Sequence, residues 1–400
     1  MDVLLNDEEQ LVASSAREFL EGECSTALVR QMEEDPIGHP PELWAKCAEM
    51  GWTGMCLAEE YGGQALPFTY LGLVMQEVGR AMAPIPLHST AVTSLAIQKA
   101  GTKAQCQSVL PGVSEGKTIL TWAFSEQDPR FLPETVKTTA VAQGDHFVIT
   151  GKKLFVDNFA ASNQILVACR TAPASATNAG LSLFLIDSNA AGISHARLRT
   201  LAKDQQCEVM FEQVRVPKAN MLGGLNQGWP IMQDLLDLAT VLLCTQILGA
   251  TRMDAEMAID HSKFREAFGQ PIGAFQSIQH TCADMIISID GGELLAYEAL
   301  WKMDNGMPAQ VEVSQAKAFC NDKCPAVCRN SQSIHGGIGF MMEFDLHLWL
   351  RRVTAWSMRL GTSYEHRERI AQALLDMPGQ VVLGQPVPVE TRRLLSASIF

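Results

Sequence analysis

Long helical segments in the second half of the sequence constrain the fold more than any other feature. From residue 230 onward, apolar side chains recur at helical spacing over residues 230–267, 275–304, 308–332, 342–352 and 362–375. Long helices joined by short turns pack side by side when neighbouring helices run in opposite directions. The second half of the chain therefore predicts an antiparallel helical bundle.

The first part of the chain is also helical, whereas the middle changes to the spacing of strands. Asn6 can cap a first helix, and further helices are predicted over residues 41–50, 68–81, 87–100 and 104–116. Strand-like runs follow at residues 118–124, 138–143, 146–150, 153–156, 164–169, 181–186 and 208–216. The prediction is an α+β fold with a helical domain at 1–117, a β-barrel-like middle domain at 118–223, a C-terminal antiparallel helical bundle at 224–378 and a tail at 379–400.

Charge and hydropathy argue against two classes of partner. The formal net charge is −13 and the chain has no basic run, which argues against nucleic acid. No apolar run reaches the roughly 18 residues of a membrane span, and the start of the chain lacks the pattern of a secretory signal. With 47% hydrophobic residues, the chain can bury a large core and subunit interfaces. We therefore expect a soluble cytoplasmic protein without a membrane span.

The eleven cysteines are scattered and form no CxxC pair. Cys320, Cys324 and Cys328 share one helix face, which allows a metal site as one interpretation. No histidine or carboxylate cluster accompanies them at ligand spacing, and Pro325 is expected to interrupt that face. Reduced, buried thiols and no metal are therefore the expectation.

Residues 261–276 predict a corner between two helices that can bind an anion. A helix is expected to run into Phe268, where a glycine and a proline end it. A second helix restarts near Gln276, so its free amide hydrogens face the gap beside Arg265. Helix-start amides together with a guanidinium suit a diphosphate. The alternative is a plain helical corner with a surface arginine.

The same corner carries a family resemblance. Its pattern, Arg-x-x-Phe-Gly-x-Pro-Ile-x-x-Phe-Gln, resembles the signature of the acyl-CoA dehydrogenases, flavoenzymes that desaturate acyl-CoA thioesters. Two further stretches agree in order and spacing, Glu49 to Gly63 and His335 to Phe340. The resemblance covers residues 5 to 375 and implies the order of helical, β and helical domains that the periodicity predicts.

In this family, FAD lies between the β domain and the bundle of its own subunit, while a neighbouring subunit holds its diphosphate and adenosine. By resemblance, the residues that bind the neighbour's FAD are Arg265, Phe268, Gln276, Gly336 and Gly337. The usual glutamine three positions before the first glycine is Ser333 here, with Gln332 one place away.

The resemblance also assigns the residues on the flavin-ring side. Ser125 would offer its hydroxyl to the ring edge, Trp122 lies just upstream, and Phe155 corresponds to the aromatic residue against the ring. The serine that usually touches flavin and CoA is Phe131 here. Asp157 stands where threonine is common, and its charge is unfavourable beside a flavin that gains negative charge on reduction.

The family's catalytic base is missing from both of its known positions. Most members carry a glutamate at the position of Leu360, and a minority carry it at the position of Ala239, so no catalytic residue is assigned. Asp237 matches a family aspartate with a substrate-binding or structural role. Glu365 could be a displaced base, but we expect it to pair with Arg367 or Arg369 instead. The residue His335 is expected to be packed in the glycine turn.

The resemblance implies a subunit of a heteromeric, FAD-dependent acyl-CoA dehydrogenase, as in steroid side-chain or fatty acid degradation. Such a chain would lack its own glutamate and complete the FAD site of a sister subunit in a heterotetramer. Two alternatives stay open: a homomeric enzyme with a displaced base or different CoA-thioester chemistry, and a flavin-free binding protein on this scaffold. The implied partners are an acyl-CoA substrate, the sister subunit and an electron-transfer flavoprotein.

Overall fold

The computed structural model describes residues 5–376, so the predicted tail at 379–400 lies outside the described residues. The chain forms two compact units. The helical unit comprises residues up to Thr26, Pro67–Ala83 and the chain from Thr240 on; the sheet unit comprises Ala27–Leu66 and Pro84–Ala239. The predicted domain boundaries at residues 117 and 223 stay a prediction.

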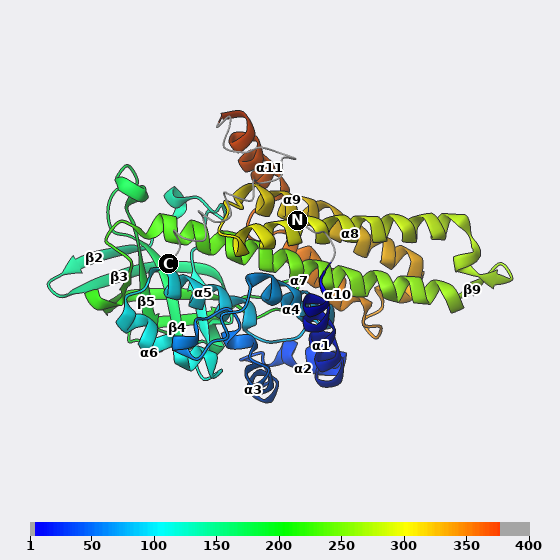
Figure 1. Cartoon of the computed structure of the whole chain (residues 1–400), viewed down its shortest axis with the longest axis horizontal. Helices are drawn as coiled ribbons and strands as arrows, with labels where there is room; N and C mark the ends of the chain where they lie inside the picture. The colour runs from blue at the N-terminus through cyan, green and yellow to red at the C-terminus, as the bar shows by residue number, and fades with distance from the viewer. Residues whose placement is uncertain (1–4, 377–400) are drawn as a thin grey trace. The chain divides into compact units, whose positions relative to one another are not determined.

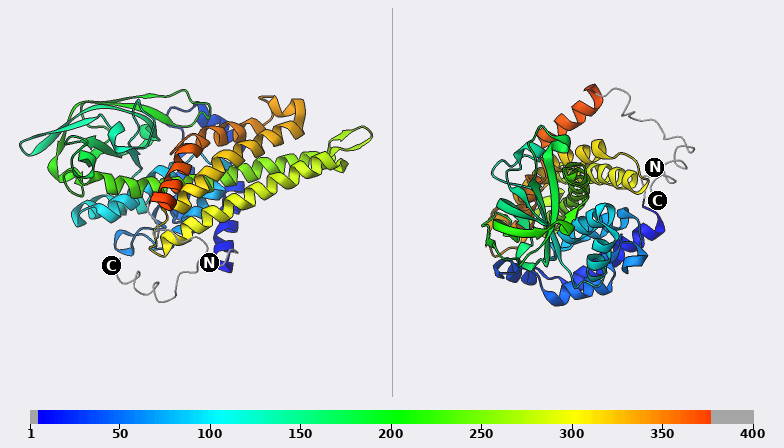
Figure 2. Two further views of the ribbon diagram at one scale, coloured as in Figure 1. Left: turned by 90° about the horizontal axis from the view of Figure 1, so that it is seen from above. Right: turned by 90° about the vertical axis from the view of Figure 1, so that its left-hand side faces the viewer.

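The helices of the helical unit are α1 (Asp7–Glu23), α4 (Phe68–Ala81), most of α7 (Gly228–Phe264), α8 (Gln276–Asp304), α9 (Gln310–His335), α10 (Leu346–Ser357) and α11 (Ser363–Ala371). The three longest of them, α7, α8 and α9, run lengthwise along one another and form the core of the predicted bundle (Figure 1). Helices α8 and α9 lie side by side in all the ribbon views (Figure 2). The predicted bounds of α4 are confirmed, since Pro67 precedes its first turn.

Two helices of this unit are capped by distinct means. Asn6 caps α1 as predicted, in a reciprocal capping box with Glu9. Helix α4 has no local cap, and the carboxylate of Asp304, at the end of α8, accepts hydrogen bonds from the amides of Phe68 and Thr69 at 2.5 and 3.0 Å. A residue more than 200 positions away therefore does the work of an N-cap, which no local sequence pattern could indicate.

Helix α7 is the one helix within residues 5–376 that has the length and apolar composition of a membrane span. Of its most apolar 18-residue window, 72% is buried inside the protein. That burial is typical of a core helix, because a spanning helix presents its apolar side chains to lipid.

The cysteines are free thiols, and all but Cys56 and Cys282 are buried. Burial raises the pKa of the Cys328 thiol well above its ordinary value, so this thiol is protonated at neutral pH. The expected interruption at Pro325 is wrong: α9 continues through this buried proline as far as His335. The loss of one backbone hydrogen bond is tolerated there because both neighbouring turns are packed in the core.

The sheet unit holds one sheet, four helices of its own and the first part of α7. The helices are α2 (Thr26–Glu34), α3 (Pro41–Glu49), α5 (Leu87–Ala100) and α6 (Lys103–Ser114). The strands are β1 (Leu120–Ala123), β2 (Thr139–Gln143), β3 (His146–Asp157), β4 (Gln164–Arg170), β5 (Leu181–Asp187), β6 (Ile193–Arg197), β7 (Gln206–Pro217) and β8 (Met221–Leu222). Their order is β6-β7-β3-β2-β4-β5-β8, with β1 paired to β4.

The β-barrel-like middle domain predicted from the sequence is observed as a sheet whose two halves pack on one core. A single parallel pair, Thr139 with Arg170, joins β2 to β4. On the two sides of this junction, Phe147 of β3 and Phe184 of β5 meet with ring centroids 4.9 Å apart. Inward side chains of both halves therefore share one apolar core.

Sequence periodicity missed the short strand β8 and two further features of this sheet. Strand β6 was not predicted, because it is an edge strand whose Ser194, His195 and Ala196 are exposed. The run at 153–156 was predicted as a separate strand but belongs to β3, which continues past a bulge between Lys153 and Val156.

Candidate functional site

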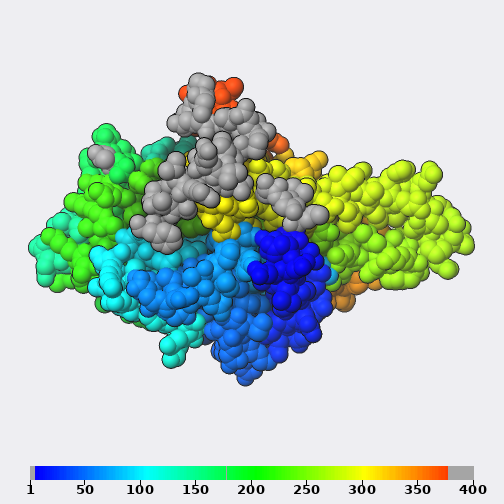
Figure 3. Space-filling view, in the orientation of Figure 1, coloured from blue at the N-terminus to red at the C-terminus, as the bar shows by residue number. Residues whose placement is uncertain are grey.

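The Arg265 corner (residues 261–276) contains a hairpin where the first of two helices was predicted to run on to Phe268. Helix α7 ends at Phe264, and the short strands β9 (Glu266–Ala267) and β10 (Gln270–Pro271) pair antiparallel. Phe268 and Gly269 both have positive φ, 56° and 81°, which makes a tight two-residue turn. The predicted helix into Phe268 is therefore wrong, because two left-handed residues cannot continue a helix. The corner forms the yellow-green end of the bundle (Figure 3).

The corner nevertheless offers the groups that an anion requires. Arg265 is exposed and makes no ion pair within residues 5–376. Helix α8 begins at Gln276 with no side-chain cap, so its first amides are available. Phe268 is 96% exposed and meets Phe275 edge to face at 6.1 Å. Arg265, Phe268 and Gln276 thus lie in one corner, and this donor set fits a diphosphate.

The glycine turn (Gly336–Phe340) follows α9 in the same unit. A Cβ atom added at Gly336 or Gly337 would have no heavy atom within 4 Å, so the backbone of both glycines is open to a ligand. Gln332 does not replace the family's glutamine. Its side-chain amide is buried against the turn, and its Oε1 would lie 3.1 Å from a Cβ atom added to Gly339. Ser333, by contrast, is exposed.

On the flavin-ring side, the three residues that the resemblance selects lie on β1, just beyond β1 and on β3 of the sheet unit. Trp122 lies on β1, and the carbonyl of Ser125 just beyond it accepts the amide of Leu154 at 2.8 Å. Phe155 follows Leu154 in the bulge of β3, where its positive φ of 55° turns the ring outward. Its side chain is about half exposed. Ser125 and Phe155 therefore lie close together, since the backbone of Ser125 is bonded to the residue that precedes Phe155.

Sequence reasoning missed the ion pair that shapes the ring-side loop (Ser125–Thr138). Lys153 on β3 is fully buried and donates to Glu126 at 2.8 Å and to the carbonyl of Phe124 at 3.0 Å. Glu126 also accepts the amides of Lys137 and Thr138 at 2.8 and 3.0 Å, which ties both ends of the loop together. Burial pushes the pKa of Glu126 up, but Lys153 and these amides outweigh it and hold that pKa below its ordinary value.

Phe131 occupies the middle of this loop. Its ring stacks on Phe124 at 5.9 Å with an interplanar angle of 14°, and Phe124 in turn meets Trp229 at 6.0 Å. The family's hydroxyl is thus replaced by an aromatic residue packed on its own unit. Asp157 lies at the end of β3 and is half-buried.

At the usual base position, a buried leucine is held in an unusual backbone conformation. Leu360 is 5% exposed and has φ 57°, a left-handed conformation that costs a leucine about 1–2 kcal/mol. Its carbonyl oxygen lies 2.8 Å from Nε2 of His366. Burial lowers the pKa of His366 to about 3, so the ring is neutral and donates this hydrogen bond.

Two further buried residues hold the same segment. The ammonium of Lys317 on α9 donates to the carbonyl of Trp356 at 3.0 Å and to Asn321 at 2.7 Å. Asn321 donates to the carbonyl of Gly361 at 3.1 Å. The backbone that presents the base in other members is therefore rigidly held here with Leu360 in its place.

Glu365 has a structural role. Its carboxylate accepts from the amide and the hydroxyl of Thr362 at 2.7 and 2.8 Å, which caps α11. Of the two partners predicted for Glu365, Arg367 pairs with Asp322 instead, and pairing with Arg369 stays a prediction. In the sheet unit, Ala239 is fully buried and its carbonyl lies 2.9 Å from Nε2 of His88, while Asp237 is buried two residues earlier.

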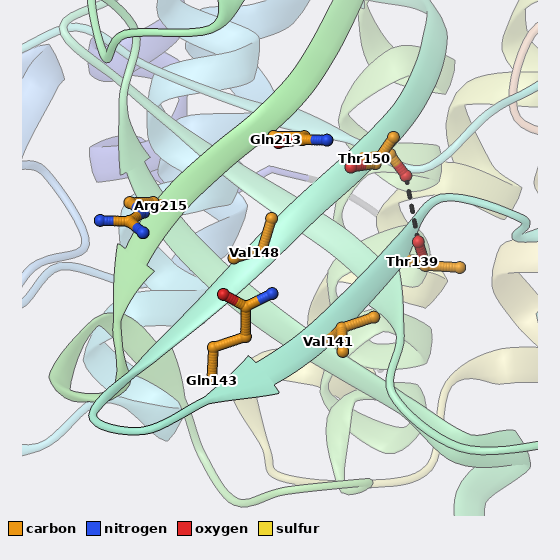
Figure 4. Close-up of a pocket in the computed structure, with 7 residues that line it drawn as sticks. All are labelled: Thr139, Val141, Gln143, Val148, Thr150, Gln213 and Arg215. Carbon is orange, nitrogen blue, oxygen red and sulfur yellow. Dashed lines mark hydrogen bonds between the residues drawn. The ribbon is translucent and has the colours of Figure 1, made fainter.

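An open polar depression of about 240 Å³ lies elsewhere, on the outward face of β2, β3 and β7 (Figure 4). It is lined by Thr139, Val141, Gln143, Val148, Thr150, Gln213 and Arg215. None of the residues predicted to bind FAD lines it.

Domain models of one family match the chain in order. The N-terminal domain of acyl-CoA dehydrogenase matches residues 6–117, the middle domain matches residues 121–214 and the C-terminal domain matches residues 226–375. These ranges together span nearly all of the described residues.

Individual relatives match along almost their whole length. The chain is 27% identical to the caffeyl-CoA reductase-Etf complex subunit CarC of Acetobacterium woodii, over 92% of this chain and 99% of that protein. Butyryl-CoA dehydrogenase from Megasphaera elsdenii has a TM-score of 0.86 and 26% identity, over 94% and 100%. A variant of the Tcur3481-Tcur3483 steroid ACAD has a TM-score of 0.82 and 28% identity, over 93% and 98%. The chain therefore belongs to the acyl-CoA dehydrogenase family, as an acyl-CoA dehydrogenase-type enzyme whose cofactor is FAD.

Proposed function

We propose that this chain is the glutamate-lacking subunit of a heteromeric acyl-CoA dehydrogenase and that it completes the FAD site of a sister subunit. The observation that carries the proposal is the difference between the two sets of predicted residues. The Arg265 corner and the glycine turn keep open donors and an open backbone. The usual base position holds the buried Leu360, and the nearby Glu365 is committed to capping α11.

In this assembly, each residue set has a distinct task. Arg265 and the first amides of α8 bind the diphosphate of the partner's FAD, and Gly336 and Gly337 let its adenosine approach the backbone. FAD supplies the hydride acceptor for desaturation of the thioester. The carboxylate that takes the α-proton comes from the sister subunit. Trp122, Ser125 and Phe155 form the weaker ring-side half of this chain, and Asp237 has a role near substrate.

Exposed apolar side chains and the relatives both support a hetero-oligomer. Phe264, Phe268 and Phe340 of the helical unit are each at least 70% exposed, as expected for a surface that another subunit covers. CarC is a subunit of a reductase-Etf complex, and the steroid ACAD carries the names of two proteins. We accordingly assign an electron-transfer flavoprotein as acceptor, a bulky or fatty acyl-CoA as substrate and the cytoplasm as location.

The composition of the purified assembly tests the proposal. Expressed with its glutamate-bearing sister, the chain is expected to co-purify as a mixed oligomer with fewer FAD molecules than subunits. Native mass spectrometry gives the subunit count, and the flavin absorbance after denaturation gives the FAD count. A stable homotetramer of this chain with one FAD per subunit that oxidises an acyl-CoA unaided would refute the proposal. That outcome would favour an enzyme with a displaced base.

Arg265→Ala is expected to lower the FAD affinity of the mixed oligomer about tenfold or more. A charge-assisted bidentate contact contributes about 1.5–3 kcal/mol, and 1.4 kcal/mol corresponds to a factor of ten. FAD titration of the apo-oligomer measures the loss. Lys263→Ala is the matched control, since Lys263 is exposed two residues away and paired with Asp260. Equal affinity of the Arg265 variant and the wild type would mean that Arg265 is only a surface residue.

A further inference from the structure

A pair of histidine rings joins the two segments of the helical unit that are assigned to FAD. His261 lies in the last turn of α7, four residues before Arg265, and His335 ends α9 directly before Gly336. The ring centroids are 4.5 Å apart and the planes are inclined by 27°, so the two rings stack. This stack is a direct contact between the Arg265 corner and the residue that immediately precedes the glycine turn.

The His335 ring is fixed from several sides. Its Nδ1 lies 2.9 Å from the carbonyl oxygen of Ser331, so in the neutral ring Nδ1 carries the proton and donates it. Phe344 meets the same ring at 5.3 Å. The turn packs against this residue, because a Cβ atom added to Gly339 would lie only 3.0 Å from Cβ of His335. A displacement of the His335 ring would therefore move the glycine turn.

Few groups around the histidine pair could stabilise a positive charge on it. His335 is 5% exposed, and its buried Nε2 has no hydrogen-bond partner among the described residues. On the other side of the stack, Phe264 meets His261 edge-on at 5.4 Å. Arg265, the charged group that acts on His261, is itself positive, while Lys263 and Asp260 of the same turn pair with each other. A proton added to the His335 ring would therefore lack a partner among the described residues, and one added to the His261 ring would lie beside the positive Arg265.

We propose that the His261–His335 stack is a positioning pair. It holds the Arg265 corner and the glycine turn at the separation that the diphosphate and adenosine of one FAD require, and mild acid breaks the stack. This inference rests on the proposed function of the two segments. It goes beyond that function in naming the residues that set the site's geometry and in making FAD retention dependent on pH.

The direction of the pH effect follows from burial. Burial lowers the pKa of both His261 and His335 below the ordinary value of 6.5, and for His261 the neighbouring His335 and Arg265 lower it further. A histidine with a lowered pKa in the folded state stabilises that state fully above its ordinary pKa, and the stabilisation is lost as the pH falls. The stack is therefore intact at neutral pH and weakens below about pH 6.5.

The first measurement is FAD affinity of the mixed oligomer against pH. The dissociation constant of the wild type is expected to rise about tenfold or more from about pH 7.5 to about pH 5.5. The double variant His261→Phe, His335→Phe keeps two stacked rings that cannot be protonated, so its affinity should change far less over this range. His146→Gln on β3, in the sheet unit, is the control and should follow the wild type. The same steep pH dependence in the double variant would overturn the inference.

The second measurement does not require FAD. Amide hydrogen exchange of residues 336–340 is compared between the wild-type chain and the double variant at each pH, which removes the intrinsic pH dependence of exchange. Faster exchange of the wild-type turn at acid pH supports the positioning role, and identical exchange at every pH refutes it. If the wild type and the Arg265→Ala variant bound FAD equally poorly while this difference persisted, the proposed function would fail and the stack would stand as a device of the fold.

Discussion

Lys153→Met is expected to lower the free energy of unfolding by about 3–5 kcal/mol, because it leaves the carboxylate of Glu126 buried without its counter-ion. Lys153 is fully buried, and its ammonium is bonded to Glu126 at 2.8 Å and to the carbonyl of Phe124 at 3.0 Å. Glu126 ties both ends of the ring-side loop, so the loss should also loosen residues 125–138. Urea unfolding measures the first effect, and hydrogen exchange of the loop measures the second.

Two variants separate the buried pair from a general effect of losing a lysine. Lys152 is adjacent on β3, but its pair with Glu208, at 3.1 Å, is substantially exposed. Lys152→Met should therefore cost less than about 1 kcal/mol. Adding Glu126→Leu to Lys153→Met removes the orphaned charge and should recover much of the loss. Equal costs for the two lysine variants would show that the buried pair has no special energetic role.

Asp254→Asn is expected to stabilise the protein, by an amount that grows with pH. Asp254 on α7 is fully buried, and among the described residues its carboxyl oxygens make no hydrogen bond of regular geometry, although the side chains of Ser331 and Cys328 lie near them. The hydroxyl of Ser331 donates at 3.0 Å to the backbone carbonyl of Asp254 instead. Burial raises the pKa of this carboxyl from 3.8 to about 8, although the side chains of Ser331 and Cys328 lower it in part. The folded protein therefore keeps it protonated where the unfolded chain ionises it.

The sign of the pH dependence follows from proton binding. Between about pH 4 and about pH 8 the folded state holds one more proton than the unfolded state, so wild-type stability falls as the pH rises through this window. A pKa unit corresponds to 1.36 kcal/mol, which makes the whole change on the order of 5 kcal/mol. Asparagine does not titrate. The free energy of unfolding of Asp254→Asn should therefore exceed that of the wild type by nearly zero at about pH 4 and by several kcal/mol at about pH 8.

The measurement is a series of urea unfolding curves across this pH range. Asp284→Asn is the matched control, because Asp284 is exposed on α8 of the same unit. A change at this surface position should shift stability by no more than about 0.5 kcal/mol at any pH. Parallel stability curves for the wild type and Asp254→Asn would mean that the Asp254 carboxylate is accommodated in the folded core at neutral pH.

The sequence by itself determined the elements whose signals are local. Helix α5 spans Leu87–Ala100 as predicted, and Gly144 with Asp145 turns the hairpin between β2 and β3. The spacing of apolar residues and the backbone preferences of glycine and proline act over a few positions, so they can be read without the fold. The Arg265 motif likewise led to the family and to FAD, both of which the domain models and relatives support.

Only the tertiary structure decided which polar residues are buried and what they contact. Lys153 and Asp254 look like surface residues in the sequence, and Asp304 gives no sign that it caps α4. The stack of His261 on His335 joins residues from two helices, and the tight turn at Phe268 replaces a predicted helical turn. Desolvation and long-range pairing set these outcomes, because the cost of burying a charge or a polar atom depends on partners that the fold brings from distant positions.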